Sequence, residues 1–399
     1  MVAVHVIEIA LLAAAFSFLG YLLLVTLLAS RARLRHSFAA VTRRKFAVIV
    51  PAHNEEAGIA ATLRSIAAVA YPRALVEIVV VADNCTDATA ARARNEGARV
   101  VERREPGLRG KGYALRYGFD RLLASEAAYD AFVVIDADSV VSTNFLSVMN
   151  WYLEHGSSAV QSSDLVDPGN TAWSAQMTRV GFLLYNYVRP LGRRVLGGTA
   201  GLRGNGMCFS ASVLKEIPWE AYSVNEDLEY GTHLLLRGVN VTFAPEATVL
   251  ATMPAEANNA RSQRARWEGG RFHIMRLYAL RLLGRALGTP SLACLDAFVD
   301  LVMPALTNLV GAVLAAGFLT LILALAGVPA AGLYALLWGV AAAAGGLHLF
   351  IGLRVAGADP AAYVALAHLP RYALWKLSVY AGMPGRWSRN VWARTAREN

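Results

Sequence analysis

The sequence predicts an α/β protein in which a mainly parallel sheet is attached to membrane-spanning helices. Short runs rich in Val and Ile alternate with alanine-rich stretches, and longer apolar stretches lie near both ends of the chain. Polar clusters directly follow several of the short apolar runs. Continuous apolar strands that alternate with helices are typical of a parallel sheet that is covered on both faces.

The composition favours a protein in contact with lipid. Of the 399 residues, 56% are hydrophobic, and the mean hydropathy is +0.39. The formal net charge is +9, which fits anionic headgroups or phosphorylated substrates and does not by itself separate these from nucleic acid. Three cysteines far apart in the sequence suit neither a zinc site nor a disulfide framework, so we expect reduced thiols in the cytosol.

The first apolar stretch, residues 6–30, is long enough to cross about 30 Å of hydrocarbon, and we expect an N-terminal transmembrane helix over residues 1–30. A cleaved signal peptide is the alternative, but it requires a basic leading region, and here the basic residues follow the apolar stretch. Positive charge next to a span favours the cytosolic side, which places the following domain in the cytosol. The basic residues in question are Arg31, Arg33, Arg35, Arg43, Arg44 and Lys45.

Two further spans are expected near the other end, over residues 299–327 and 331–353, and together they predict a transmembrane hairpin within 297–353. The last apolar segment, 361–383, is interrupted by polar residues and is followed by a basic tail. We therefore expect residues 354–399 to form an interfacial helix and a cytosolic tail, with a further span as the alternative.

The cytosolic domain is expected over residues 31–260. Its predicted strands are 46–51, 76–83, 98–102 and 131–138, and helix-compatible stretches lie at 57–70 and 86–96. PAHNEE, ADNCTD and DADS occur at three of the strand ends, where ligands bind in such sheets. One Asp there is explained equally well as a helix N-cap, but three clusters predict a shared site.

Asp136 and Asp138 are the sharpest pair, because side chains two residues apart in an extended segment point the same way. Two carboxylates beside a phosphate-bearing substrate suit Mg²⁺ or Mn²⁺, although a solvated turn would carry the same residues. In RGKGYAL, Lys111 lies between two glycines, a pattern that suits a diphosphate but also fits a flexible loop. The sequence contains neither a P-loop nor a GxGxxG motif, which disfavours ATPases and dinucleotide-binding enzymes.

Two more motifs follow. The acids of NED, Glu226 and Asp227, open a predicted helix, where they either favour the helix dipole or accept a proton from a substrate. QRARW, residues 263–267, precedes a basic and apolar stretch, and we expect interfacial helices over 261–296. An arginine and a tryptophan here are explained either as membrane anchors or as part of a site.

In this order and spacing, PAHNEE, ADNCTD, DAD, NED and QRARW resemble the D, DxD, ED and QxxRW elements of the family 2 inverting glycosyltransferases with a GT-A fold. That family includes cellulose, chitin and hyaluronan synthases and ceramide glucosyltransferase. The resemblance covers roughly residues 46–270 and implies a GT-A fold, a Rossmann-like domain, for the cytosolic part.

The resemblance also implies roles for single residues. Pro51, Ala52, Glu55 and Asp83 would hold the nucleotide of the donor, Lys111 and Asp136 would extend that site, and Asp138 would hold the metal, Mg²⁺ or Mn²⁺. Asp227 matches the catalytic base, and Asn205 and Glu226 would lie on the acceptor side. Within QRARW, Gln263 belongs to the motif, Arg266 would meet the leaving diphosphate, and Trp267 would meet the acceptor sugar.

The implied function is transfer of a sugar from a UDP-sugar to a lipid-linked or membrane-proximal saccharide, in exopolysaccharide or glycolipid biosynthesis. The implied protein is multi-pass in the inner cell membrane, with a cytoplasmic catalytic domain, membrane lipids as partners and no nucleic acid. A processive polysaccharide synthase is the alternative, although GNGMC replaces the FFCGT of cellulose synthases. A nucleotide-sugar pyrophosphorylase would need neither QRARW nor spans, and a silent binding subunit would not need Asp138, Asp227 and Arg266 together.

Overall fold

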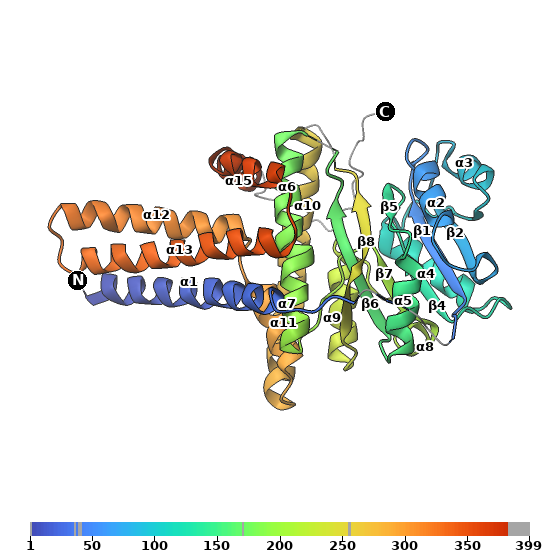
Figure 1. Ribbon diagram of the computed structural model, residues 1–399, viewed down its shortest axis with the longest axis horizontal. Coiled ribbons are helices and arrows are strands. Elements are labelled where there is room, and N and C mark those ends of the chain that lie inside the picture. Colours follow the sequence, from blue (N-terminus) through green and yellow to red (C-terminus); the bar gives the residue numbers. More distant parts are fainter. Residues whose placement is uncertain (1, 36, 39–41, 170, 254–256, 382–399) are drawn as a thin grey trace.

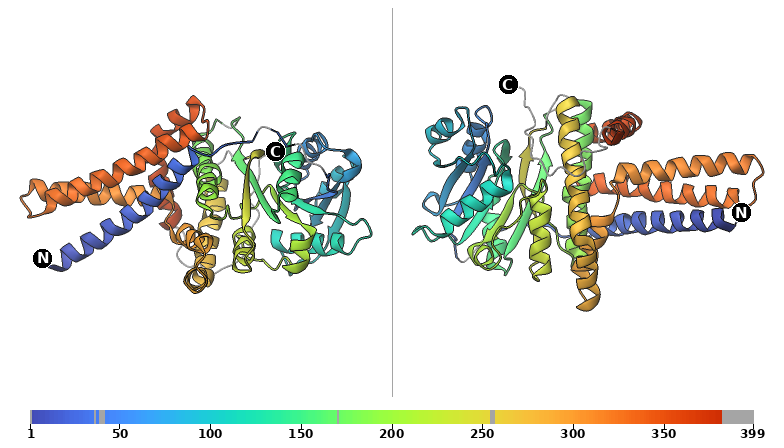
Figure 2. Two further views of the ribbon diagram at one scale, coloured as in Figure 1. Left: turned by 60° about the horizontal axis from the view of Figure 1, so that its bottom comes forward. Right: turned by 180° about the vertical axis from the view of Figure 1, so that it is seen from behind.

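The computed structural model describes residues 2–35, 37–38, 42–169, 171–253 and 257–381. In this part of the chain, three long helices extend from one side of an α/β domain (Figure 1). Long helices that run across these three form a wall between them and the sheet (Figures 1 and 2). The molecule therefore has a sheet, an intervening helical layer and a group of projecting helices.

The sheet has eight strands in the order β3-β2-β1-β4-β7-β6-β8-β5. The half of the sheet formed by β3, β2, β1 and β4 is parallel, whereas β7 is antiparallel to both of its neighbours. The α/β GT-A prediction is thus confirmed, with a sheet that is more mixed than the apolar pattern indicated. The strands are β1 (Phe46–Ala52), β2 (Val76–Asp83), β3 (Arg99–Arg103), β4 (Ala131–Val134), β5 (Ser139–Val141), β6 (Ala159–Val166), β7 (Met207–Ser210) and β8 (Val241–Ala251).

The apolar runs are continuous because both faces of the sheet are covered. Along β1, Ala47 and Ile49 belong to one hydrophobic core, and Phe46, Val48 and Val50 belong to the other. Helices on the two faces complete these cores and leave the carboxyl ends of the strands open. The helices next to the sheet are α2 (Ile59–Ala67), α3 (Thr89–Asn95), α4 (Lys111–Leu123), α5 (Phe145–Glu154), α8 (Ala211–Glu216) and α9 (Glu226–Leu236).

The helical wall is built from two columns that lie side by side in Figure 1. One column runs through α6 (Trp173–Phe182), the π-helical segment η2 (Leu183–Val188) and α7 (Arg189–Leu196). The other consists of α10 (Ala257–Gly288), which carries QRARW, with α11 (Leu292–Val302) packed against it.

Three helices are long and apolar enough to cross a membrane among the described residues: Val4–Ala29, Leu306–Leu325 and Ala331–Val355. They lie within α1 (Val2–Ala29), α12 (Leu306–Leu325) and α13 (Ala331–Val355). The first part of the predicted span 299–327 does not belong to the hairpin, because α11 ends before Pro304 and a new helix begins at Leu306. Proline lacks the N–H that a continuous helix would need at this point.

The C-terminal segment forms α14 (Pro360–Ala365), η3 (Leu366–His368) and α15 (Leu369–Ala381). The 13 residues of α15 would extend about 20 Å as a helix, too short to cross the hydrocarbon. This helix packs against α6, α10 and α12, beside the base of the hairpin (Figure 1). Residues 382–399 of the predicted basic tail lie outside the described residues.

A buried ion-pair cluster joins the projecting helices to the wall. Arg193 of α7 pairs with Asp296 at 2.6 Å and with Asp300 at 2.9 Å, both from α11. Tyr21 of α1 donates a hydrogen bond to Asp296 at 2.6 Å. A Cβ added at Gly192 would lie 1.8 Å from the carbonyl oxygen of Val25, so α7 and α1 meet backbone to backbone.

Candidate active site

A single cavity of about 1880 Å³ opens at the carboxyl ends of the parallel strands. It extends from the loops after β1, β2 and β4, past α9 and α10, to the bases of α12 and α13. Every residue that the motifs singled out lines this cavity. They are Pro51, Ala52, Glu55, Asp83, Lys111, Asp136, Asp138, Asn205, Glu226, Asp227, Gln263, Arg266 and Trp267. The role of each of these residues stays a prediction.

The first end of the cavity lies between the loops that follow β1 and β2. Asp83, the last residue of β2, is buried and forms an ion pair with Arg103 at 2.6 Å. Burial raises the pKa of the Asp83 carboxyl above its ordinary value, although the Arg103 guanidinium works in the opposite direction. The backbone N–H of Glu55 donates to the Thr89 hydroxyl at 2.7 Å, which ties the two loops together.

The DAD motif lies beyond its strand. Because β4 ends at Val134, the extended geometry expected for Asp136 and Asp138 is wrong, and both residues lie in the connection to β5. The Asp136 N–H donates to the Asn205 side chain at 3.0 Å, and the Ser139 hydroxyl donates to Asp138 at 3.3 Å. The two acids still line the cavity, held by the loop and not by strand periodicity.

Lys111 is the first residue of α4 and forms an ion pair with one of these acids. Its ammonium pairs with Asp136 and lies 3.8 Å from Glu226. Burial alone would lower the pKa of Lys111, but the carboxylates of Asp136 and Glu226 outweigh this effect and raise it. The following Gly112 serves packing and not close approach to a ligand, because a Cβ there would lie 2.2 Å from the Ala221 carbonyl oxygen.

The NED acids open α9, as the sequence predicts. Burial raises the pKa of Glu226 to about 8, with Lys111 opposing and Asp227 reinforcing this shift. Burial also raises the pKa of Asp227, against hydrogen bonds from backbone N–H groups and the charges of Lys111 and Arg203. Burial thus favours the neutral form of both carboxyl groups, and the nearby cation opposes it.

QRARW is brought to the NED acids by a direct contact between α10 and the start of α9. The Asn225 side chain donates a hydrogen bond to the Trp267 carbonyl oxygen at 3.2 Å. A Cβ added at Gly270 would lie only 2.1 Å from the Asn225 side-chain oxygen. The Trp267 ring packs against Phe182, with ring centroids 5.9 Å apart.

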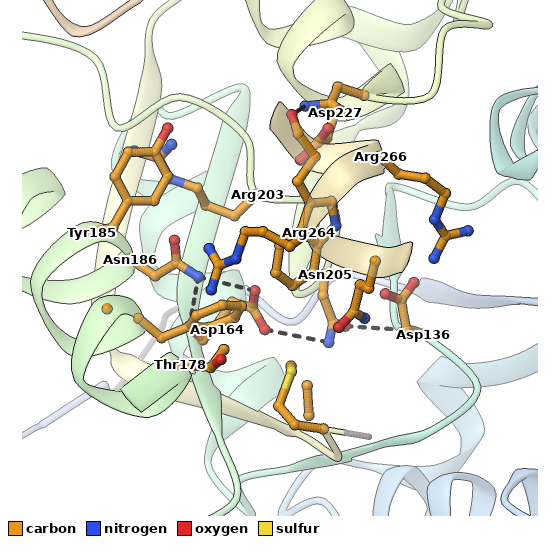
Figure 3. Close-up of a pocket in the computed structure, with 18 of the residues that line it drawn as sticks. Asp136, Asp164, Thr178, Tyr185, Asn186, Arg203, Asn205, Asp227, Arg264 and Arg266 are labelled. Carbon is orange, nitrogen blue, oxygen red and sulfur yellow. Dashed lines mark hydrogen bonds between the residues drawn. The ribbon is translucent and has the colours of Figure 1, made fainter. Parts of the chain in front are cut away.

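A polar chain that the motifs did not predict crosses the centre of the cavity (Figure 3). Asn186 donates to the buried carboxylate of Asp164 at 3.2 Å, and Asn205 lies 3.5 Å from its other oxygen. Asn205 also contacts the backbone N–H of Asp136 and donates to Ser139 at 2.9 Å. Asp164 therefore supports the DAD loop through Asn205. The sequence signal that could have revealed it is an acid inside the apolar strand VQSSDLV.

The motifs also failed to predict a group of basic and aromatic side chains on the far side of this polar network. The Tyr185 ring lies 4.7 Å from the Arg189 guanidinium and 4.2 Å from that of Arg203. Arg264 lies over both Trp267 and Tyr372, at 5.4 and 5.9 Å. These side chains come from four separate segments, and no sequence spacing links them.

The chain is similar to several known proteins. The family model described as "Glycosyltransferase like family 2" matches residues 43–270. "Probable glycosyltransferase YdaM" of Bacillus subtilis is 25% identical over 243 residues, which are 58% of this chain and 56% of the relative. A "Probable glycosyltransferase" of Sulfolobus acidocaldarius is 26% identical over 242 residues, 57% of this chain and 50% of the relative. The chain thus spans about half the length of the curated relatives it matches.

Among solved structures, the mannosyltransferase PcManGT from Pyrobaculum calidifontis, in complex with GDP-Man and Mn²⁺, has a similar fold. Its sequence is 19% identical, the superposition covers 84% of this chain and 97% of that one, and the TM-score is 0.53. This similarity confirms the GT-A fold. Because the family model matches more than half of the chain, the family and enzyme class inferred from the motifs are confirmed as well: the chain belongs to glycosyltransferase family 2.

Proposed function

We propose that this protein is a membrane-anchored inverting glycosyltransferase. It transfers a sugar from a nucleoside diphosphate sugar, expected to be a UDP-sugar, to a lipid-linked or membrane-proximal acceptor in glycolipid or exopolysaccharide biosynthesis. The observation that carries this proposal is the convergence of five distant motifs on one cavity beside helices that are apolar enough to span a membrane.

The proposed chemistry requires stabilisation of the negative leaving group and removal of a proton from the acceptor. Breaking the bond between the anomeric carbon and the diphosphate leaves negative charge on the departing nucleotide. Arg266 and Lys111, which both line the cavity, would stabilise this charge. The acceptor hydroxyl loses its proton to Asp227 while its oxygen bonds to the anomeric carbon from the opposite face. The Trp267 ring offers an apolar face to the acceptor sugar.

A divalent metal fits this site only together with the donor. Among the described residues, no three His, Cys, Asp or Glu side chains form a ready-made metal site. Asp138 supplies a hard carboxylate beside the proposed diphosphate position, and Mg²⁺ or Mn²⁺ is commonly held by one or two carboxylates plus substrate phosphates. When bound, such an ion would neutralise charge on the leaving diphosphate.

Two substitutions test the division of roles. Asp227→Asn should lower kcat at least about a hundredfold through loss of the base, with UDP affinity nearly unchanged. Asp138→Ala should instead weaken metal-dependent UDP binding. Calorimetry of UDP binding with and without Mn²⁺, together with turnover in lipid nanodiscs, separates the two effects.

The matched control is Asp120→Asn, an exposed acid of α4 outside the cavity, which should behave like the parent protein.

Trp267→Ala should raise KM for the acceptor more than it changes hydrolysis of the donor. Equal turnover by Asp227→Asn and the parent would remove the base assignment.

A further inference from the structure

A buried lysine of the C-terminal helix α15 reaches the helix that carries QRARW. The ammonium of Lys376 lies 2.9 Å from a carboxylate oxygen of Glu268 on α10, and the two side chains are only 4% and 12% exposed. Both residues line the cavity. Glu268 directly follows Trp267 in the sequence, so the ion pair lies next to the residue proposed to meet the acceptor sugar.

The same ammonium contacts the first helix of the apolar hairpin. It donates a hydrogen bond to the hydroxyl oxygen of Thr307 at 2.9 Å, in the first turn of α12. The helix α15 packs against both α10 and α12. Lys376 therefore connects the C-terminal segment, the QRARW helix and the beginning of a candidate membrane span.

Neighbouring contacts hold the same stretch of α10. Arg271, three residues after Glu268 and so on the same side of the helix, donates to the carbonyl oxygen of Met303 at 2.8 Å. The Tyr372 ring of α15 lies 5.9 Å from the guanidinium of Arg264. Contacts from α15 and from the turn before α12 thus converge on the part of α10 that carries QRARW.

A different side of α10 faces the NED motif, where Gly270 packs against Asn225. Successive residues of an α-helix point about 100° apart around its axis. The position at which Glu268 is held therefore also determines which way the Trp267 side chain faces.

The ion pair has the energetics of a contact that fixes geometry. Burial lowers the pKa of the Lys376 ammonium, and the Glu268 carboxylate opposes this shift. Removing two charges from water costs about as much as their attraction returns, so such a pair contributes little net stability. Replacing both partners by uncharged side chains is often neutral for folding, whereas removing one leaves the other buried without its counter-charge.

We propose that Lys376 is a positioning residue for sugar transfer, which acts through Glu268 to hold the Trp267 ring on the acceptor side of the cavity. This inference rests on the proposed function, because it concerns the same reaction. Lys376 contacts none of the reacting atoms in this account. Its bond to Thr307 places the link at the base of the apolar hairpin.

Fluorine NMR of the full chain in detergent micelles tests the placement without reference to activity. Tryptophan is replaced by fluorotryptophan, and the signal of Trp267 is assigned by its loss in Trp267→Phe. Lys376→Met should shift or broaden this signal, because the ring leaves its fixed surroundings. Lys215→Met is the matched control, since Lys215 is exposed on α8 and does not line the cavity, and its spectrum should equal that of the parent. An unchanged Trp267 signal in Lys376→Met would overturn the proposal.

The double variant Glu268→Gln with Lys376→Met separates positioning from stability. Thermal unfolding of Lys376→Met should begin at a lower temperature than for the parent, and the double variant should recover most of this loss. The Trp267 signal of the double variant should nevertheless stay displaced, because the link between α10 and α15 is still missing. A parental signal in the double variant would show that the pair only stabilises the fold.

Kinetics in lipid nanodiscs, with octyl glucoside as the acceptor probe, connect the placement to the reaction. In the double variant, KM for octyl glucoside should rise about tenfold, while KM for the sugar donor stays within about twofold. Equal changes in the two KM values would contradict a role on the acceptor side. Absence of nucleoside diphosphate release with every donor contradicts the proposed function, whereas the NMR signal still reports on the placement of Trp267.

Discussion

Glu226 and Asp227 are adjacent acids with different expected duties, and burial raises the pKa of both. A base must be deprotonated to accept a proton, so a raised pKa moves the acidic limb of kcat/KM to a higher pH than an ordinary aspartate would give. Glu226→Gln puts an uncharged amide where burial already favours the neutral acid, so it should leave this limb close to its parental pH. A pH profile of kcat/KM checks this expectation; a clear shift of the limb in either direction would contradict a neutral Glu226.

A second prediction concerns Asp164, the buried acid of β6. Burial raises its pKa well above the ordinary range, and asparagine, which keeps the size of the side chain and one acceptor oxygen, is its closest substitute. Asp164→Asn should retain the position of Asn205, whereas Asp164→Ala should loosen Asn205 and the Asp136 loop and raise KM for the donor about tenfold. Steady-state kinetics of the two variants separate a positioning role from a bulk loss of stability, which would appear in thermal unfolding of both.

Single residues were predictable where a motif carried them and unpredictable where only the fold brings them together. The positions of Asp83, Asp138 and Asp227 could be predicted because their types and spacing follow strand ends and a helix start. Arg203 and Arg264 could not, since no motif or spacing links them to the other residues of the cavity.

At the scale of elements, the contact between α10 and the start of α9 decides where QRARW lies. Alanine is a better helix former than glycine, so Gly270→Ala should favour α10 itself while forcing it away from Asn225. Because small displacements are costly at a reaction centre, we expect kcat/KM to fall between about ten- and a hundredfold. Gly284→Ala is the control on the same helix, since its Cβ would meet nothing within 4 Å. Unchanged kinetics of Gly270→Ala would show that this contact does not position the site.

The four predicted strands match β1 to β4, whereas β5, β6, β7 and β8 were not predicted. Three further differences are informative. The DAD acids lie past the end of β4, because β4 pairs with β1 and β7 only as far as Val134. The predicted span from 299 is divided at Pro304, and α11 joins the wall. The antiparallel β7 is short, and an apolar run of four residues carries no information about strand direction.

At the scale of the whole molecule, the ion-pair cluster around Arg193 connects α1, α7 and α11. Arg193→Met would leave Asp296 and Asp300 buried with one fewer cation, a change that typically costs about 3–5 kcal/mol. Thermal unfolding of the protein in nanodiscs should therefore begin at a clearly lower temperature than for the parent. The control is Arg354→Met, an exposed arginine of α13, which should leave the transition unchanged. Equal transitions for the two variants would contradict a structural role of the cluster.

The overall plan of an α/β domain with three long apolar helices could be predicted from the sequence, but the contacts that connect these parts could not. Gly192, Tyr21 and Asp296 meet only after α1 has packed against the wall, and their types suggest nothing of the kind in isolation. The continuity of the cavity from the acids to the base of α12 and α13 likewise exists only in three dimensions.

The central claim is that this one cavity transfers a sugar from a nucleoside diphosphate. The most direct measurement is release of nucleoside diphosphate by the purified protein in lipid nanodiscs, with a panel of UDP- and GDP-sugars, with Mn²⁺, with Mg²⁺ and with a chelator. We expect metal-dependent release from at least one donor, lost in Asp227→Asn. Absence of release from every donor, or undiminished release by Asp227→Asn, would contradict the account.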